Sequence, residues 1–197
     1  ATNAFGIFID ETRISGLPQD VLQAARAAAQ KEGKAGWKFT LHAPSYLPVM
    51  QYADDRGLRE TMYRESVTRA SEFGKPEWDN TAHVARIVAL RHELAQLLGY
   101  ASFAHVSLVP KMAQSPEQVL AFLEDLATRA RPFAEQDAFE LREFSKKLGI
   151  HDLQAWDVAY VSEKLRAERY SFSDQEVKQY FPEKVVVQGL FRLAETL

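Results

Sequence analysis

The sequence predicts a mainly α-helical fold with one or two short strands near residues 37–41. Helix start and stop signals recur along the chain, and apolar residues recur at helical spacing between them. The alternation typical of a half-buried strand is confined to one run, in which polar residues separate Trp37, Phe39 and Leu41. Since no repeat or linker is visible, we expect residues 1–197 to form a single helical segment with no internal boundary.

Prolines, glycines and capping residues set the expected helix boundaries. Pro18 and Asp20 suit the first turn of a helix. The Ala-rich run 21–30 continues this helix, and Gly33 ends it. Further helices are expected after Pro44 and Pro48, over 56–73, from Asp79 or Asn80 to Leu98, over 156–169, from the capping box 173–176 to Tyr180, and from Pro182 to Leu197.

The longest expected helix begins at a strong start signal. Ser115 is placed to cap it, Pro116 takes the first helical position, and Gln118 can complete a capping box. The helical pattern continues through Leu148, and Gly149 closes it.

The composition excludes several classes of protein. Hydrophobic residues make up 46% and charged residues 26% of the 197 residues, which is ordinary for a soluble globular protein. The formal net charge of −3 argues against a nucleic-acid partner. The lack of cysteine excludes disulfides, thiolate nucleophiles and Cys-based zinc sites, and it favours a reducing compartment such as the cytoplasm. There is no signal-peptide pattern, and no apolar run approaches the roughly 20 residues that span a bilayer, so no membrane partner is expected.

One helical segment contains half of a zinc motif. His92 and Glu93 begin like H-E-x-x-H, but the fifth position is Gln96, whose neutral amide is a poor zinc ligand. The other histidines have no recognisable ligand spacing to His92. On a helical wheel His92 lies on the shoulder of the apolar face and Glu93 on the polar side. We therefore expect both to be surface residues; a zinc site that uses His92, Glu93 and an unidentified third ligand is the alternative.

Other chemical candidates are single residues. Arg91 projects within the apolar arc of the same helix, so we expect it to be buried and paired with a carboxylate from another helix. The aromatic segment with Trp156, Asp157 and Tyr160 has two interpretations: core packing with Asp157 near a helix N-terminus, or the lining of a cleft. Anchors of a helix junction are expected at Phe172, Tyr180 and Phe181.

Six stretches of the chain, in this order and spacing, resemble the thimet oligopeptidase and oligopeptidase A family of zinc metallopeptidases. No single stretch is catalytic, but together they extend along essentially the whole chain. The stretches are residues 44–50, 78–80, 90–100, 111–113, 155–157 and 180–182.

The resemblance implies a mostly helical, two-lobed enzyme whose deep channel admits short peptides. The family's H-E-x-x-H motif, its third zinc ligand and its transition-state residues come later in the family's sequence, and none matches a position here. The chain would thus be an internal piece of a larger cytoplasmic enzyme, providing scaffold and channel wall, with Trp156, Asp157 and Tyr160 near the channel. Its partners would be short peptides and the missing catalytic lobe. Zinc is expected in the full-length protein and not in this chain, which would be inactive alone and prone to self-association.

A second hypothesis is a standalone helical scaffold or interaction domain without catalysis. It would share ancestry with the peptidases but have no chemistry of its own.

Overall fold

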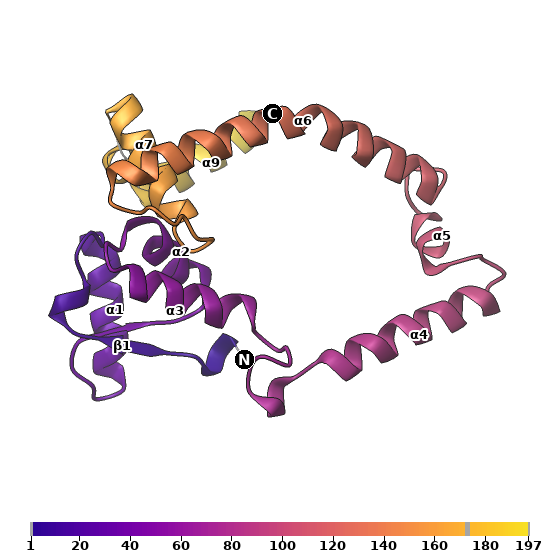
Figure 1. Cartoon of the computed structure of the whole chain (residues 1–197), viewed down its shortest axis with the longest axis horizontal. Coiled ribbons are helices and arrows are strands. Elements are labelled where there is room, and N and C mark those ends of the chain that lie inside the picture. The colour runs from indigo at the N-terminus through magenta and orange to yellow at the C-terminus, as the bar shows by residue number, and fades with distance from the viewer. Residues whose placement is uncertain (1, 172–173, 197) are drawn as a thin grey trace. The chain divides into compact units, whose positions relative to one another are not determined.

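The computed structural model describes residues 2–171 and 174–196, which are mainly helical, as predicted (Figure 1). Strands β1 (Ile7–Ile9) and β2 (Trp37–Phe39) pair antiparallel, with Ile7 opposite Phe39. Short 3-10 turns cover Thr2–Ala4, Glu11–Arg13 and Pro76–Trp78. The α-helices are α1 (Gln19–Lys31), α2 (Ala43–Tyr52), α3 (Arg56–Val67), α4 (Thr81–Leu97), α5 (Phe103–Leu108), α6 (Pro116–Lys147), α7 (Val158–Tyr170), α8 (Asp174–Lys178) and α9 (Glu183–Thr196).

The helices and strands form two compact units. The first unit contains residues 65–142, and the second contains residues 2–64 and 143–196. The chain therefore leaves the second unit within α3 and returns to it within α6. Among the described helices, none combines the length and apolar content that a membrane span requires.

The hydrophobic core lies in the second unit. On α1, Leu22, Ala25 and Ala29 are buried at spacings of three and four residues, so one face of this helix lies against β2. Phe39 of β2 is fully buried, and α7 packs on α2. The buried residues of this core are Ile9, Leu17, Leu22, Ala25, Phe39, Leu41, Val49, Met50, Ala53, Leu58 and Met62.

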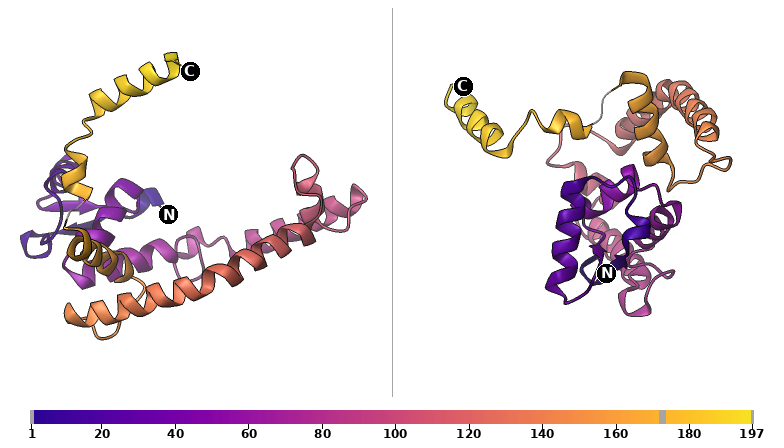
Figure 2. Two further views of the ribbon diagram at one scale, coloured as in Figure 1. Left: turned by 90° about the horizontal axis from the view of Figure 1, so that it is seen from above. Right: turned by 90° about the vertical axis from the view of Figure 1, so that its left-hand side faces the viewer.

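The start of α6 follows the predicted capping signal. Ser115 Oγ accepts a hydrogen bond from the Gln118 backbone N–H at 3.2 Å, and Pro116 is the first helical residue. The Gln118 side chain accepts from the backbone N–H of Gln114 at 2.8 Å, one residue earlier than in a standard capping box. The helix continues through Pro132 to Lys147 and is drawn unbroken in Figure 2.

Three predicted helix boundaries were wrong by two residues or more. The helix expected over 56–73 ends at Val67, because the chain then turns and Ala70 adopts a left-handed conformation with φ of 54°. The helix expected from residue 156 begins at Val158, and the helix expected to reach Tyr180 ends at Lys178. The capping box over 173–176 begins at Ser173, which lies outside the described residues.

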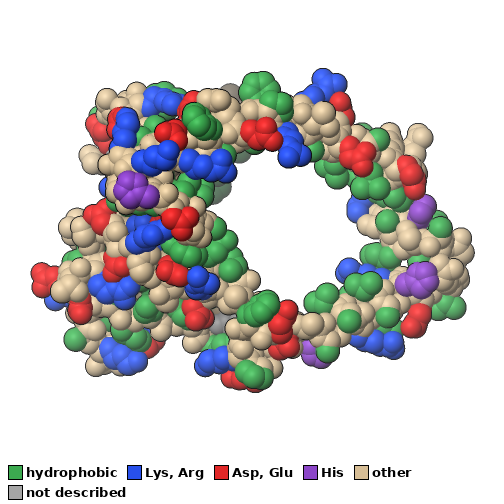
Figure 3. All heavy atoms as spheres, in the orientation of Figure 1, with side chains coloured by type: hydrophobic (Ala, Val, Ile, Leu, Met, Phe, Trp, Pro, Cys, Tyr) green, Lys and Arg blue, Asp and Glu red, His purple; other side chains and the backbone are tan. Residues whose placement is uncertain are grey.

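The described residues leave most of the apolar face of α4 exposed, and this corrects the expectation for Arg91. Instead of being buried against a carboxylate, Arg91 is exposed and its guanidinium lies 4.9 Å from the centre of the Phe103 ring. Figure 3 shows hydrophobic side chains reaching the surface along this helix. The exposed large apolar residues of α4 are Val84, Ile87, Val88, Leu90, Leu94 and Leu97.

The expected helix junction before α9 is also not packed. Tyr180 and Phe181 are 79% and 64% exposed, so neither anchors a junction in this structure. Phe172, the third expected anchor, lies outside the described residues.

Truncation of a core leucine should cost far more stability than truncation of an exposed one. Leu58 is completely buried, so Leu58→Ala should lower the free energy of unfolding by about 2–5 kcal/mol. Leu97 is 84% exposed, so Leu97→Ala should change the free energy of unfolding by no more than about 0.5 kcal/mol. Urea unfolding followed by circular dichroism measures both, and equal losses would contradict the assignment of the core.

Candidate functional site

The half zinc motif lies on the surface of α4. His92 and Glu93 are both exposed, as expected, and Glu93 lies 3.7 Å from Arg86. Gln96 donates from its side-chain nitrogen to the carbonyl oxygens of Tyr100, at 3.3 Å, and Ala101, at 3.2 Å. Its amide therefore holds the chain just after the helix end. In the described part of the chain, no group of three or more His, Asp or Glu side chains is placed to hold a metal ion.

The most developed polar cluster is in the second unit, where Asp157 precedes α7. Its carboxylate is fully buried and accepts from Arg56 Nη2 at 2.7 Å and from Arg59 Nη2 at 2.8 Å. The backbone N–H of Gln154 adds a further bond at 3.1 Å. The carbonyl of Asp157 accepts the first helical bond of α7, from Val161 at 2.8 Å. The predicted position of Asp157 at a helix N-terminus is thus confirmed.

The guanidinium groups decide the ionisation of Asp157. Burial raises the pKa of this carboxyl, but the hydrogen bonds from Arg56, Arg59 and the Gln154 backbone outweigh burial and hold the pKa below its usual value. Asp157 is therefore ionised at neutral pH. The same interaction raises the pKa of Arg56.

Arg59 connects this carboxylate to two other elements. Its side chain is 1% exposed, and its Nη1 donates to the carbonyl of Ala53, the residue that ends α2, at 2.6 Å. The guanidinium also lies 4.1 Å from the centre of the Tyr160 ring on α7. One buried cation thus joins the end of α2, the body of α3 and the start of α7.

A second carboxylate extends the cluster toward solvent. Asp54 accepts from Ser15 Oγ at 2.7 Å and from the Tyr160 hydroxyl at 2.9 Å, and Lys164 Nζ lies 3.5 Å away. Burial raises the pKa of Asp54, but the Ser15 and Tyr160 hydroxyls and Lys164 lower it more. Burial and the hydrogen bond to Asp54 raise the pKa of Tyr160 to about 12, so the phenol stays protonated.

The neighbouring carboxylate, Asp55, stabilises the start of α3. It pairs with Arg13 and accepts from the backbone N–H of Leu58 at 2.9 Å. We call Asp54, Asp55, Arg56, Arg59, Asp157 and Tyr160 the ion cluster.

Trp156 lies beside the ion cluster. Its ring centre is 6.1 Å from that of Tyr63, and the Arg64 guanidinium lies 5.0 Å from it. Its indole N–H is buried without a hydrogen-bond partner among the described residues. Trp156 and Tyr160 are half-buried, whereas Asp157 is fully buried. Their place near a substrate channel stays a prediction.

The sequence interpretation missed the arginines and the role of Asp54. The available signal was Arg59, a charged residue on the apolar face of α3 between Leu58 and Met62. A guanidinium in such a position requires a buried carboxylate. The donors surrounding Asp157 show that this cluster holds elements together; each carboxylate oxygen is already bonded.

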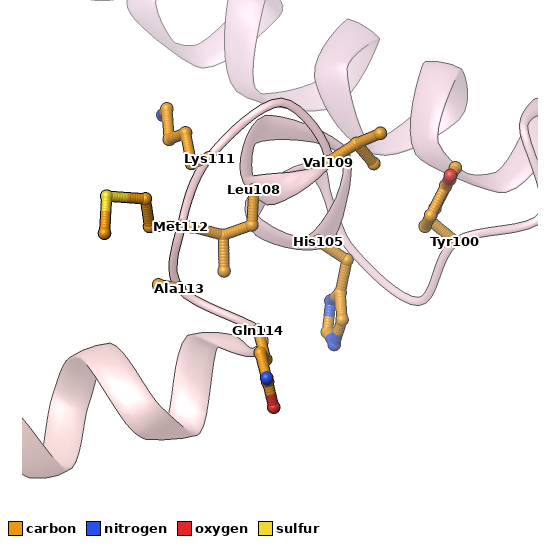
Figure 4. Close-up of a pocket in the computed structure, with 8 residues that line it drawn as sticks. All are labelled: Tyr100, His105, Leu108, Val109, Lys111, Met112, Ala113 and Gln114. Atoms are coloured by element: carbon orange, nitrogen blue, oxygen red, sulfur yellow. The ribbon is translucent and has the colours of Figure 1, made fainter.

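A hollow of about 380 Å³ lies in the first unit, around α5 (Figure 4). Its polar side chains are partly engaged with neighbours: His105 Nδ1 lies 2.9 Å from Ser102 Oγ, and Lys111 Nζ donates to Ser107 Oγ at 2.8 Å. Met112 at its edge is fully exposed. The lining comprises Tyr100, His105, Leu108, Val109, Lys111, Met112, Ala113 and Gln114.

Comparison with known proteins identifies the family. The model of peptidase family M3 matches residues 49–197, which include every residue of the ion cluster. The chain belongs to this family. It is 48% identical to oligopeptidase A of Salmonella typhimurium over 194 residues and 49% identical to that of Escherichia coli over 191 residues, matches that cover 97% and 95% of the chain. The organellar oligopeptidase A of Arabidopsis thaliana is 40% identical over 208 residues, with the whole chain covered.

The chain spans just over a quarter of the length of these relatives, 28% of each bacterial protein and 26% of the plant protein. Peptidases of family M3 are generally zinc-dependent. The described residues of this chain do not fit a zinc ion, because no three potential ligands lie together.

Removal of the charge of Asp157 should destabilise the second unit severely. Asp157→Asn leaves the buried Arg59 without its counter-charge, so the free energy of unfolding should fall by about 3–5 kcal/mol. The control is Asp125→Asn, which removes an exposed ion pair with Arg129 on α6. This substitution should change the free energy of unfolding little. Urea unfolding of both variants tests this, and a stable Asp157→Asn protein would show that the pair is dispensable.

The ion cluster should also make stability depend on acid pH. The folded-state pKa of Asp157 is depressed, so its stabilising contribution is complete above the unfolded-state pKa of about 4 and is lost as pH falls through the folded pKa. At pH values between the folded-state and the unfolded-state pKa of Asp157, only the unfolded chain binds the proton. Unfolding free energies measured from pH 7 down to pH 3 should therefore fall less steeply below pH 4 in Asp157→Asn than in the wild type; parallel curves would contradict the assignment.

Proposed function

We propose that this chain forms helical scaffold and part of the channel wall of a zinc-dependent oligopeptidase that hydrolyses short peptides. The observation that carries this proposal is the match to peptidase family M3 over residues 49–197. Relatives named oligopeptidase A, 45–49% identical along nearly the whole chain, support it. The lack of cysteine suits a cytoplasmic enzyme, which is the localisation that we propose.

The scaffold role is supported by the way in which α7 is attached to the core of the second unit. Its core elements come from residues 2–64, and α7 is attached to them through Asp157 and Tyr160. We propose that Asp157 acts from its buried position by fixing the start of α7. The half-buried rings of Trp156 and Tyr160 would then be the parts of this segment that lie near the peptide channel.

We further propose that zinc and the reacting groups come from residues outside this chain. The one partial zinc motif, at His92 and Glu93, is an exposed helix surface, and Gln96 is bonded to backbone carbonyls. The hydrolysis of peptides would thus require the scaffold together with a catalytic part that supplies the metal site.

The proposal predicts different behaviour for the isolated chain and for a full-length enzyme built with it. The purified chain, incubated with zinc and dialysed, should retain no stoichiometric metal by elemental analysis and should not cleave a quenched fluorescent peptide. A chimera in which the chain replaces the matched region of Salmonella typhimurium oligopeptidase A should cleave that peptide.

His92→Ala provides the control for the half motif. It should leave the metal content of the chimera unchanged, because His92 is an exposed residue of α4. Stoichiometric zinc in the isolated chain that disappears in this variant would overturn the proposal. A folded but inactive chimera would instead favour a scaffold protein without catalysis.

A further inference from the structure

The helix α9 presents an apolar face that no described residue of its own unit covers. The large apolar side chains on this face are between 43% and 64% exposed. Their spacing places them along one side of the helix, while the other side is polar except for Val185, which is 62% exposed. The apolar side, which we call the α9 face, comprises Val186, Val187, Leu190, Phe191 and Leu193; Lys184, Gln188, Arg192 and Glu195 lie on the opposite side.

We propose that the α9 face is a docking surface for another part of the same M3 peptidase polypeptide. This inference rests on the proposed function. An amphipathic helix binds protein partners by laying such a face, with anchors at spacings of three and four residues, into an apolar groove. Val186, Leu190 and Leu193 have this spacing. Exposed apolar patches of this kind mark interaction surfaces.

The length of the relatives identifies the partner. The family match continues through α9 to residue 197, so this helix belongs to the part shared with family M3. The chain spans only 28% of the bacterial oligopeptidases A that it matches, so most of the polypeptide of these relatives lies outside the matched region. That remaining polypeptide is the partner to which the proposal commits.

The charges of α9 argue against a membrane or nucleic acid as the partner. Its acidic residues, Glu183 and Glu195, balance its basic residues, Lys184 and Arg192. Helices that bind anionic membranes carry an excess of Lys and Arg on their polar side, and nucleic-acid surfaces require a basic patch. A helix whose charges balance in this way suits packing within a protein.

A single introduced thiol tests the docking, because the chain has no cysteine of its own. Leu190→Cys reports on the α9 face, and Gln188→Cys is the matched control on the polar side. Each is placed in the 197-residue chain and in the full-length chimera with Salmonella typhimurium oligopeptidase A. Maleimide labelling is followed by mass spectrometry of the peptide that contains the new cysteine, so thiols of the relative do not interfere.

Both thiols should label at similar rates in the 197-residue chain. In the chimera, labelling of Leu190→Cys should be at least about tenfold slower than in the chain, because a covered thiol reacts only when the contact opens. Labelling of Gln188→Cys should change less than about twofold. If the chimera does not fold, as judged by circular dichroism, the same pair is placed at the aligned positions of the Salmonella enzyme itself.

Three results would overturn the proposal. They are unchanged labelling of Leu190→Cys in the full-length protein, equal protection at both positions, and protection of the 197-residue chain by anionic vesicles, which would assign the face to a membrane. Protection that grows with the concentration of the 197-residue chain, without protection in the full-length protein, would assign the face to a second copy. Peptide cleavage by the same chimera is measured separately. Cleavage without protection of the Leu190→Cys thiol would contradict only the docking surface. Protection of that thiol without cleavage would contradict only the proposed function.

Discussion

The buried carboxylate of Asp157 imposes the constraint around which the second unit is arranged. A charge removed from water is tolerated only with close counter-charges and filled hydrogen bonds, and Arg56 and Arg59 supply them from α3. These partners lie 101 and 98 residues earlier in the sequence. Because Arg59 also bonds the carbonyl of Ala53, the same interaction sets where α2 ends and where α7 begins.

Perturbed titration behaviour alone would have suggested a catalytic centre here. Asp54, Asp157 and Tyr160 have shifted pKa values, and such groups gather at active sites. The hydrogen bonds argue for a structural role instead. Asp157 accepts from three donors, and the Tyr160 hydroxyl is bonded to Asp54, so neither group is poised to take or give a proton. In a peptidase scaffold such a network would position nearby aromatic rings and leave the chemistry to other residues.

Local signals in the sequence predicted most of the helices, although α5 was missed, and they did not predict interactions between distant residues. Pro116 and its capping partners are contiguous, so the start of α6 was predicted to the residue. The end of α3 depends on a left-handed Ala70, which no local rule favours. Strand β1 was missed because its three residues are all apolar and do not alternate. Of the ion cluster, Asp157 and Tyr160 were singled out from the sequence. The position of Arg59 on the apolar face of α3 was a signal for a buried ion pair, but its pairing with Asp157, 98 residues away, appears only in three dimensions.

The error at Arg91 and the exposure of α9 share a feature of the structure. The amphipathic pattern of α4 was interpreted as packing within the chain, but the apolar sides of both α4 and α9 are exposed. The hydrophobic residues thus fall into two sets: a buried set around β2, α1, α2 and α3, and an exposed set along α4, α6 and α9. The first set builds a rigid support for the ion cluster. Because the second set has helical periodicity and is exposed in the described part of the chain, contacts with further polypeptide of the kind that we propose for α9 would explain its sequence.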